Sequence, residues 1–287
     1  MMTTEPWNSG CHFGGCHTDQ RNTGCKGPIE ACGTGRALRC LDLLNCLESC
    51  EEVIRTTVGD VQVPRWKRAF DLACVLFTAP GWAPLMALIA LFVKCVSPGP
   101  VFFRQERVGL RGQHFGCLKF RTMKVNADAA VHQEHLRQLI ATDRPMTKMD
   151  ALGDSRLIWG GRFLRSSGLD ELPQLLNVLR GEMSIVGPRP CTPFECRHYE
   201  EWHRKRFNVL PGLTGLWQVN GKNNTTFRQM ILLDLYYALH LHPWLDCVIM
   251  WKTLGVLAAQ ITESHSGVGA PPAAYPSNLK KKQVPVA

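Results

Sequence analysis

Two adjacent carboxylates and an arginine between prolines are the residues of this sequence best suited to chemistry. Asp170 and Glu171 stand immediately before a leucine-rich run, and Arg189 follows that run in the segment "GPRP". Gly168 and Gly181 bound the run, so the spacing predicts one helix of about ten residues that begins near Asp170. At a helix N-terminus, free N–H groups and the helix dipole stabilise negative charge.

A structural role accounts for such an acidic pair in most helices, because one acid caps the helix and the other complements its dipole. A chemical role is also open, because the same helix end binds phosphate and the flanking prolines hold the Arg189 side chain ready for phosphate oxygens. An ionised carboxylate can attack phosphorus as a nucleophile, and two adjacent acids can hold a divalent cation against a diphosphate. Together these residues indicate phosphoryl chemistry.

A long apolar segment precedes these residues and indicates a membrane nearby. From Leu72 to Val93 there is no charged residue, and as a straight helix this run would reach about 33 Å, enough to span a bilayer core. Pro80 and Pro84 bend a helix near its middle, and basic residues flank the run on both sides. A re-entrant hairpin that dips into one leaflet satisfies both observations, and a spanning helix is the alternative.

The composition is basic, with 33 Lys and Arg against 24 Asp and Glu. A basic excess suits nucleic acid, an anionic membrane surface or a phosphorylated substrate. The basic residues are scattered rather than clustered with aromatic residues on one element, which argues against a nucleic-acid-binding protein. No nucleic-acid partner is therefore expected.

The 13 cysteines suggest either disulfides or a metal site, and the sequence favours neither. The first thirty residues lack an apolar core that could act as a secretion signal, so we expect reduced, cytosolic cysteines. No CxxC pair occurs among the N-terminal candidates, whose spacing matches no closed zinc site: Cys11, Cys16, His17, Cys25 and Cys32.

The pattern along the chain predicts a helix-rich α+β protein in four parts. Residues 1–64 are a leader, largely disordered, with a short amphipathic helix at about 35–55. Residues 65–100 form the membrane segment, residues 101–261 the main folded domain, and residues 262–287 a disordered tail.

Residues 97–123, which begin at the end of the membrane segment, read as strand and turn, and Thr225 or Thr226 caps a later helix. Residues 244–260 are apolar and rich in Trp, and they fit either a core helix or a helix in the membrane interface.

From about residue 67 to residue 257 the chain resembles the bacterial sugar transferase family, the small monotopic polyprenyl-phosphate phosphoglycosyl transferases. The motifs that carry the resemblance follow in order: "KRAFDL", "SPGPVFFRQERVG", "KFRTM", "GRFLRSSGLDELPQLLNVLRGEMSIVGPRP", "RFNVLPGLTGLWQVNGKN" and "LDLYY…WLDCVIMWKT". The resemblance implies a membrane-associated catalytic domain with a proline-broken re-entrant hairpin and interfacial amphipathic helices.

The resemblance also implies a reaction. Asp170 would attack the β-phosphate of a nucleoside diphosphate sugar and hold the phospho-sugar covalently, and polyprenyl (undecaprenyl) phosphate would then accept it. Glu171 would assist, and Mg²⁺ would bridge both acids and the diphosphate. This would be the first membrane step of exopolysaccharide or related glycan assembly, on the cytoplasmic face of the bacterial inner membrane, with downstream glycosyltransferases as potential partners.

Further residues acquire roles from the same resemblance. The substrate-binding residues would be Lys119, Arg121, Pro188, Arg189 and Lys222. Lys222 stands where the family usually has Arg, so it keeps the charge but lacks the bidentate fork.

In the membrane hairpin, Pro80 would mark the break, and Arg68 and Asp71 would pair at its mouth. A routine ion pair within one helix is the alternative explanation for Arg68 and Asp71. For the whole protein, the alternative to an enzyme is a catalytically inactive membrane scaffold of the same fold.

Overall fold

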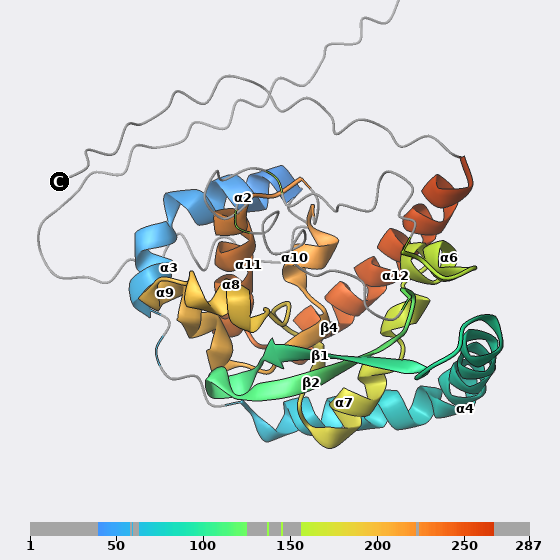
Figure 1. Cartoon of the computed structure of the whole chain (residues 1–287). Helices are drawn as coiled ribbons and strands as arrows, with labels where there is room; N and C mark the ends of the chain where they lie inside the picture. Colours follow the sequence, from blue (N-terminus) through green and yellow to red (C-terminus); the bar gives the residue numbers. More distant parts are fainter. Residues whose placement is uncertain are drawn as a thin grey trace, which may run out of the picture. The chain divides into compact units, whose positions relative to one another are not determined.

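The computed structural model of this protein describes residues 40–57, 59, 63–124, 137, 145, 156–221 and 224–266. Its helices and strands lie in one compact unit, Leu38–Ala287 (Figure 1). The first elements are α2 (Cys40–Ser49), α3 (Glu51–Thr57), α4 (Arg65–Val96), β1 (Phe102–Val108) and β2 (His114–Phe120). The later elements, in chain order, are α6 (Gly161–Ser166), the 3₁₀ turn η3 (Leu169–Glu171), α7 (Gln174–Arg180), β3 (Ser184–Val186), α8 (Pro193–Arg197), α9 (Glu201–Arg204), η4 (Lys205–Asn208), β4 (Gly212–Thr214), α10 (Leu216–Val219), α11 (Phe227–Leu239) and α12 (Pro243–Ser266).

The predicted helix-rich α+β fold is confirmed, and its strands form two small sheets. β1 and β2 pair antiparallel, which confirms the strand and turn expected at 97–123. β3 and β4 pair parallel and bring the "GPRP" segment, which follows β3, against residues 210–212. The approach is so close that a Cβ atom on Gly187 would lie 2.3 Å from the Leu210 carbonyl oxygen. Only glycine fits there.

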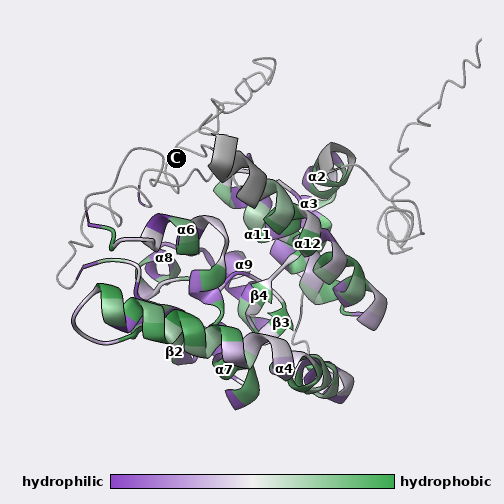
Figure 2. Ribbon diagram, turned by 90° about the vertical axis from the view of Figure 1, so that its right-hand side faces the viewer, coloured by the Kyte–Doolittle hydropathy of each residue, from purple (hydrophilic) through white to green (hydrophobic). Residues whose placement is uncertain are grey.

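The helix α4 carries the apolar segment and bends without breaking. It runs continuously through Pro80 and Pro84, yet its two halves point in different directions in Figures 1 and 2. Prolines produce such bends because each removes a backbone hydrogen bond. Trp82 Nε1 donates to the Val75 carbonyl oxygen at 2.9 Å, so the indole bridges the two sides of the first proline. The predicted proline-broken segment is therefore one bent helix rather than two separate helices.

Both ends of α4 pack on the rest of the protein while its middle is exposed. Val75 packs with Val178 and Met183, and Val93 packs with Phe120, but Phe77 is 88% exposed. Among the described residues, α4 alone is long and apolar enough to cross a membrane, and Figure 2 shows its hydrophobic colouring. Its topology in a membrane remains a prediction.

The helix α11 is buried along almost its whole length. Met230, Leu232 and Leu235 have no exposed surface, and Thr226 begins the helix with a capping box that involves Gln229, as the predicted cap requires. α2 and α3 pack against α11. The short helix expected at 35–55 is therefore a helix pair at 40–57 that belongs to the compact unit, while residues 1–35 lie outside the described part of the chain.

The helix α12 combines the two settings expected for residues 244–260. Asp246 and Ile249 are buried, whereas Trp244 and Trp251 are 71% and 77% exposed. One side of α12 is therefore core, and the other presents tryptophans to its surroundings. The helix also continues to Ser266, beyond the predicted domain end at residue 261.

Candidate active site

The two acids lie in a tight turn rather than in the first turn of a long helix. Asp170 and Glu171 belong to η3, and Pro173 is the N-cap residue of the seven-residue helix α7. The chain enters this turn through Gly168, with φ at 74°, and leaves α7 through Gly181, with φ at 80°. The predicted helix end at Gly181 is confirmed, but neither acid occupies the N-cap of α7.

Lys119 lies against Glu171, the second of the two acids. Its Nζ atom is 2.6 Å from Glu171 Oε1, and the two side chains are 22% and 45% exposed. Lys119 comes from β2, about fifty residues before Glu171 in the chain. The structure thus brings together two of the predicted site residues and leaves them open to an incoming ligand.

Asn177 fixes the position of α7, and with it the acidic turn, against β2. Its Oδ1 accepts a hydrogen bond from the Leu118 backbone N–H at 3.0 Å, and its Nδ2 donates to the Gly116 carbonyl at 2.8 Å. Asn177 is fully buried, so it functions like an additional strand residue beside β2. Sequence reasoning missed it, although an asparagine inside the run "LLNVL" is a polar group that must find partners once buried.

Arg189 is held by a buried acid that sequence reasoning also missed. Glu195 Oε1 accepts from Arg189 Nη1 at 3.0 Å, and Glu195 also completes a capping box with Thr192 at the start of α8. Burial opposes ionisation of Glu195, but Arg189 and Arg107 overcome it and lower its pKa to about 2. Glu195 is therefore a permanent anion at neutral pH. The pattern "TPFE" is a capping-box signature, so this residue was detectable from the sequence.

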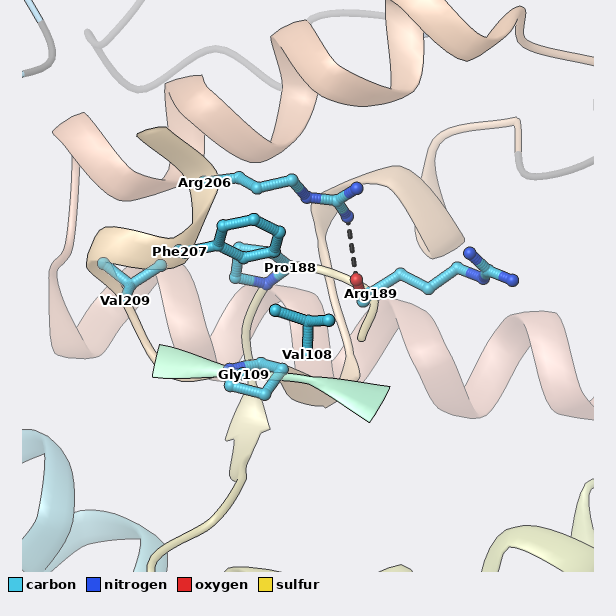
Figure 3. A pocket seen from close by; sticks show the side chains of 8 residues that line it. Val108, Gly109, Pro188, Arg189, Arg206, Phe207 and Val209 are labelled. Carbon is cyan, nitrogen blue, oxygen red and sulfur yellow. Dashed lines mark hydrogen bonds between the residues drawn. The ribbon is translucent and has the colours of Figure 1, made fainter. Parts of the chain in front are cut away.

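Two more arginines fix the backbone of "GPRP". Arg107 Nη1 donates to the Pro190 carbonyl at 2.9 Å, and Arg206 Nη2 donates to the Arg189 carbonyl at 2.8 Å (Figure 3). Arg206 also pairs with the buried Asp234. The backbone at Arg189 is thus held by two buried arginines, whereas the side chain of Arg189 itself is 22% exposed.

A small pocket lies behind "GPRP", on the side away from the Arg189 guanidinium. Figure 3 shows the Arg189 side chain pointing away from it. Its lining residues are Val108, Gly109, Pro188, Arg189, Arg206, Phe207, Val209 and Pro211. Neither acid lines it, so Pro188 contributes to packing at the back of the segment.

A comparison with known protein families now bears on this geometry. The model of the bacterial sugar transferase family matches residues 63–260, more than two thirds of the chain. The chain belongs to this family. The match begins after α3, so α2 and α3 are additions to the matched region, and they are joined to it by hydrogen bonds such as Gln229 Nε2 to Glu48 Oε1 at 2.8 Å.

Characterised relatives share about two fifths of the aligned residues. The exopolysaccharide production protein ExoY of Sinorhizobium fredii is 38% identical over 188 residues, which cover 66% of this chain and 83% of that protein. The UDP-glucose:undecaprenyl-phosphate glucose-1-phosphate transferase of Caulobacter vibrioides is 40% identical over 202 residues, or 68% of this chain and 70% of that protein. The UDP-galactose-lipid carrier transferase of Erwinia amylovora is 38% identical over 197 residues, or 67% of this chain but only 40% of its own length.

The prediction that Arg68 and Asp71 pair with each other is wrong for this sugar transferase. Arg68 donates to the carbonyls of Val178 and Leu179, at the end of α7, where orphan acceptors and the helix dipole favour a cation. Asp71 accepts from Ser184 Oγ at 3.0 Å. The two side chains therefore tie α4 to α7 and to β3 separately.

One of the predicted substrate-binding cations, Arg121, stands apart from the acids. The Arg121 guanidinium donates to the carbonyls of Pro98 and Ser97 at 2.7 and 2.8 Å and is buried, so it anchors the loop after α4. These contacts give Arg121 a structural role, and its role at the substrate stays a prediction. Lys222 lies outside the described residues.

A buried ionic network joins α4 to α12. Lys67 Nζ lies 2.6 Å from Asp246 Oδ2 and 3.7 Å from Asp71 Oδ1, and all three side chains are nearly or completely inaccessible. Tyr237 donates to Asp246 Oδ1 at 2.7 Å. These residues are far from one another in the sequence, and no motif identified them as a group.

The donor set at Asp170 and Glu171 fits a magnesium ion. Mg²⁺ prefers oxygen ligands and commonly takes one or two carboxylates, with water and substrate phosphates completing its shell. Groups of three or more His, Cys, Asp or Glu residues that could hold a metal do not occur in the described ranges. The two acids alone thus suit a metal that arrives with a diphosphate, not a pre-formed metal cage.

Proposed function

We propose that this sugar transferase moves a sugar 1-phosphate from a UDP-sugar to undecaprenyl phosphate through a covalent intermediate on Asp170. The observation that supports this most directly is the exposed Lys119–Glu171 contact beside Asp170, on a turn braced by Asn177. An inactive scaffold would not need a cation and two acids presented together on a rigid support. The named activities of the relatives support the same substrates.

In the first step, a carboxylate oxygen of Asp170 attacks the β-phosphorus of the UDP-sugar. The bond from that phosphorus to the bridging oxygen breaks, and UMP leaves. In the second step, a phosphate oxygen of undecaprenyl phosphate attacks the same phosphorus, and the Asp170 carboxylate is released.

The surrounding residues stabilise the charge that moves in both steps. Lys119 holds Glu171 and faces the oxygens around the phosphorus, and Arg189 offers its guanidinium to the diphosphate. Magnesium, when bound by Asp170 and Glu171, would neutralise the diphosphate and assist departure of UMP.

The covalent step has a direct test. Purified protein is incubated with UDP-sugars that carry ³²P in the β-position, without lipid acceptor, and peptides are analysed for label. Label should appear on the peptide that contains residue 170, and Asp170→Asn should be unlabelled and inactive although folded. Label on another residue would assign the nucleophile elsewhere, and a panel of UDP-sugars in the same assay identifies the preferred sugar.

The proposed metal has its own test in the same assay. EDTA should abolish UMP release, and Mg²⁺ or Mn²⁺ should restore it. Full activity in EDTA would show that Lys119 and Arg189 stabilise the diphosphate without a metal.

We further propose that α4 enters and leaves the cytoplasmic leaflet on the same side. Supporting observations are its bend at the prolines, its exposed apolar middle and the exposed Trp251 of α12. The test uses a variant that is otherwise free of cysteine and carries either Gln62→Cys or the native Cys95. An impermeant thiol reagent should label neither site in closed spheroplasts and both after lysis, whereas labelling of position 62 in closed spheroplasts would establish a spanning helix.

A further inference from the structure

The candidate site has two parts, the turn that carries Asp170 and Glu171 and the "GPRP" segment that carries Arg189. One face of the β1–β2 hairpin connects them. In the antiparallel register, Gln105 is opposite Cys117, Phe103 is opposite Lys119, and Arg107 is opposite Phe115. Alternate residues of a strand point to the same side of the sheet, so Gln105, Arg107 and Lys119 share one face.

The ends of this face touch the acidic turn and the "GPRP" segment. Lys119 contacts Glu171 at 2.6 Å at one end. At the other end, Arg107 donates to the Pro190 carbonyl and lies 4.0 Å from Glu195, the partner of Arg189. Burial raises the pKa of the Cys117 thiol, which also responds to the charges of Lys119, Arg107, Glu171 and Arg189. The middle of the face is therefore close to both parts.

Gln105 occupies that middle position with a fixed amide orientation. Its Oε1 accepts from Arg107 Nη2 at 2.6 Å, and because a guanidinium only donates, the oxygen must face Arg107. The amide nitrogen Nε2 then points the opposite way, and within the described part of the chain it donates no hydrogen bond. Gln105 is partly exposed, so these N–H groups can reach a ligand.

We propose that Gln105 is a substrate-binding residue that donates a hydrogen bond to the diphosphate of the nucleotide sugar, between Glu171 and Arg189. Arg107 is the positioning residue that fixes the amide. The inference rests on the proposed function and adds a neutral donor to a site otherwise built from charged groups. Diphosphate oxygens are the ligand atoms that suit it, because they accept hydrogen bonds and the cations Lys119, Arg107 and Arg189 lie along the same face or at its end.

The substitution Gln105→Glu separates binding from structure. A glutamate keeps an acceptor for Arg107, so the hairpin should remain folded, but it replaces the donor by an anion that repels the diphosphate. Binding of UDP and of UDP-glucose is measured by calorimetry in detergent with Mg²⁺, in an Asp170→Asn background that cannot turn over. Gln105→Glu should raise the Kd of both by roughly 10- to 100-fold, the range for a hydrogen bond to a charged group.

The matched control is Gln113→Glu, the same chemical change at an exposed position of the same hairpin, and it should leave both Kd values unchanged. Unchanged binding in Gln105→Glu would overturn the inference, and so would weaker binding of UDP-glucose with unchanged binding of UDP, because Gln105 would then contact the sugar. If the wild-type protein, with Mg²⁺ and without lipid acceptor, binds neither UDP nor any UDP-sugar of a panel, the proposed function itself is contradicted, and the inference falls with it.

Discussion

The protein contains two lysine–carboxylate pairs with the same separation and opposite surroundings. Lys67 and Asp246 lie 2.6 Å apart with side chains 3% and 0% exposed, and Lys119 and Glu171 lie 2.6 Å apart with side chains 22% and 45% exposed. A buried charge is costly unless it is paired, so loss of one partner destabilises the fold. An exposed pair contributes little to stability and can exchange its partner for a ligand. Distance alone therefore does not distinguish a structural pair from a functional one, whereas burial does.

The largest expected effect is on the buried pair. Lys67→Met should lower the free energy of unfolding by about 3–5 kcal/mol, because the Asp246 carboxylate is left buried without its cation. Denaturant titration in detergent micelles measures this change. Lys252→Met, the same substitution at an exposed position of α12, should have almost no effect. Equal stability of both variants would mean that the network of Lys67 does not hold α4 to α12.

The next largest effect is expected at Glu195, where it shows whether a buried, ionised glutamate stabilises the fold as the buried Lys67–Asp246 pair does. Its pKa of about 2 lies below the ordinary value of 4.5, so its ion pairing contributes stability above pH 4.5 that is lost as the pH falls towards 2. The shift corresponds to about 3 kcal/mol. Glu195→Gln should therefore be less stable than the wild type at pH 7, and this difference should shrink below pH 4.5.

Denaturant titrations of both proteins between pH 7 and pH 3 measure the difference. The exposed Glu201→Gln is the control and should differ little from the wild type at any pH. A difference between Glu195→Gln and the wild type that does not vary with pH would show that ionisation of Glu195 is unimportant.

Substitution in the exposed Lys119–Glu171 pair should lower activity without lowering stability, which is the opposite of the result expected for Lys67. Lys119→Met should lower kcat/KM for UMP release by roughly 10- to 100-fold, because the cation beside Glu171 and the diphosphate is lost, while the melting temperature stays nearly the same. Lys119→Arg should recover part of the activity, and Lys124→Met should retain all of it. A loss of stability that accompanies the loss of activity would remove the contrast between the two lysines.

The smallest effect concerns a neutral member of the buried network. Tyr237→Phe removes the hydroxyl that contacts Asp246 Oδ1 and the Val186 carbonyl, at 2.7 and 3.0 Å. A single buried hydrogen bond contributes about 1 kcal/mol, so the loss should be clearly smaller than that of Lys67→Met. The same denaturant titration measures it, and a loss as large as that of Lys67→Met would show that the tyrosine is essential to the network.

Several local features of this protein were determined by neighbouring residues and could be predicted from them. Gly181 ends α7 because it tolerates a positive φ, and Thr226 caps α11 because its hydroxyl reaches the N–H of Gln229. The short apolar runs of residues 97–123, punctuated by Pro and Gly, predicted strand and turn, and β1 and β2 lie there. The acids and Arg189 were found because their types and short spacing suit phosphoryl chemistry, and the family match agrees with that interpretation.

Only the tertiary structure decided which distant groups meet. Lys67 and Asp246 are 179 positions apart, and Asn177 and Gly116 are 61 apart, so no local pattern could show that they are partners. Arg68 and Asp71 illustrate the same limit, because their spacing allowed a pair that the carbonyls of α7 and the backbone of β3 replaced. The sequence by itself determined the local shapes and the reactive side chains, because both depend on residues close in the chain. Burial and long-range contacts depend on how the whole chain packs. They decided which charged side chains stabilise the fold and which remain accessible to a substrate.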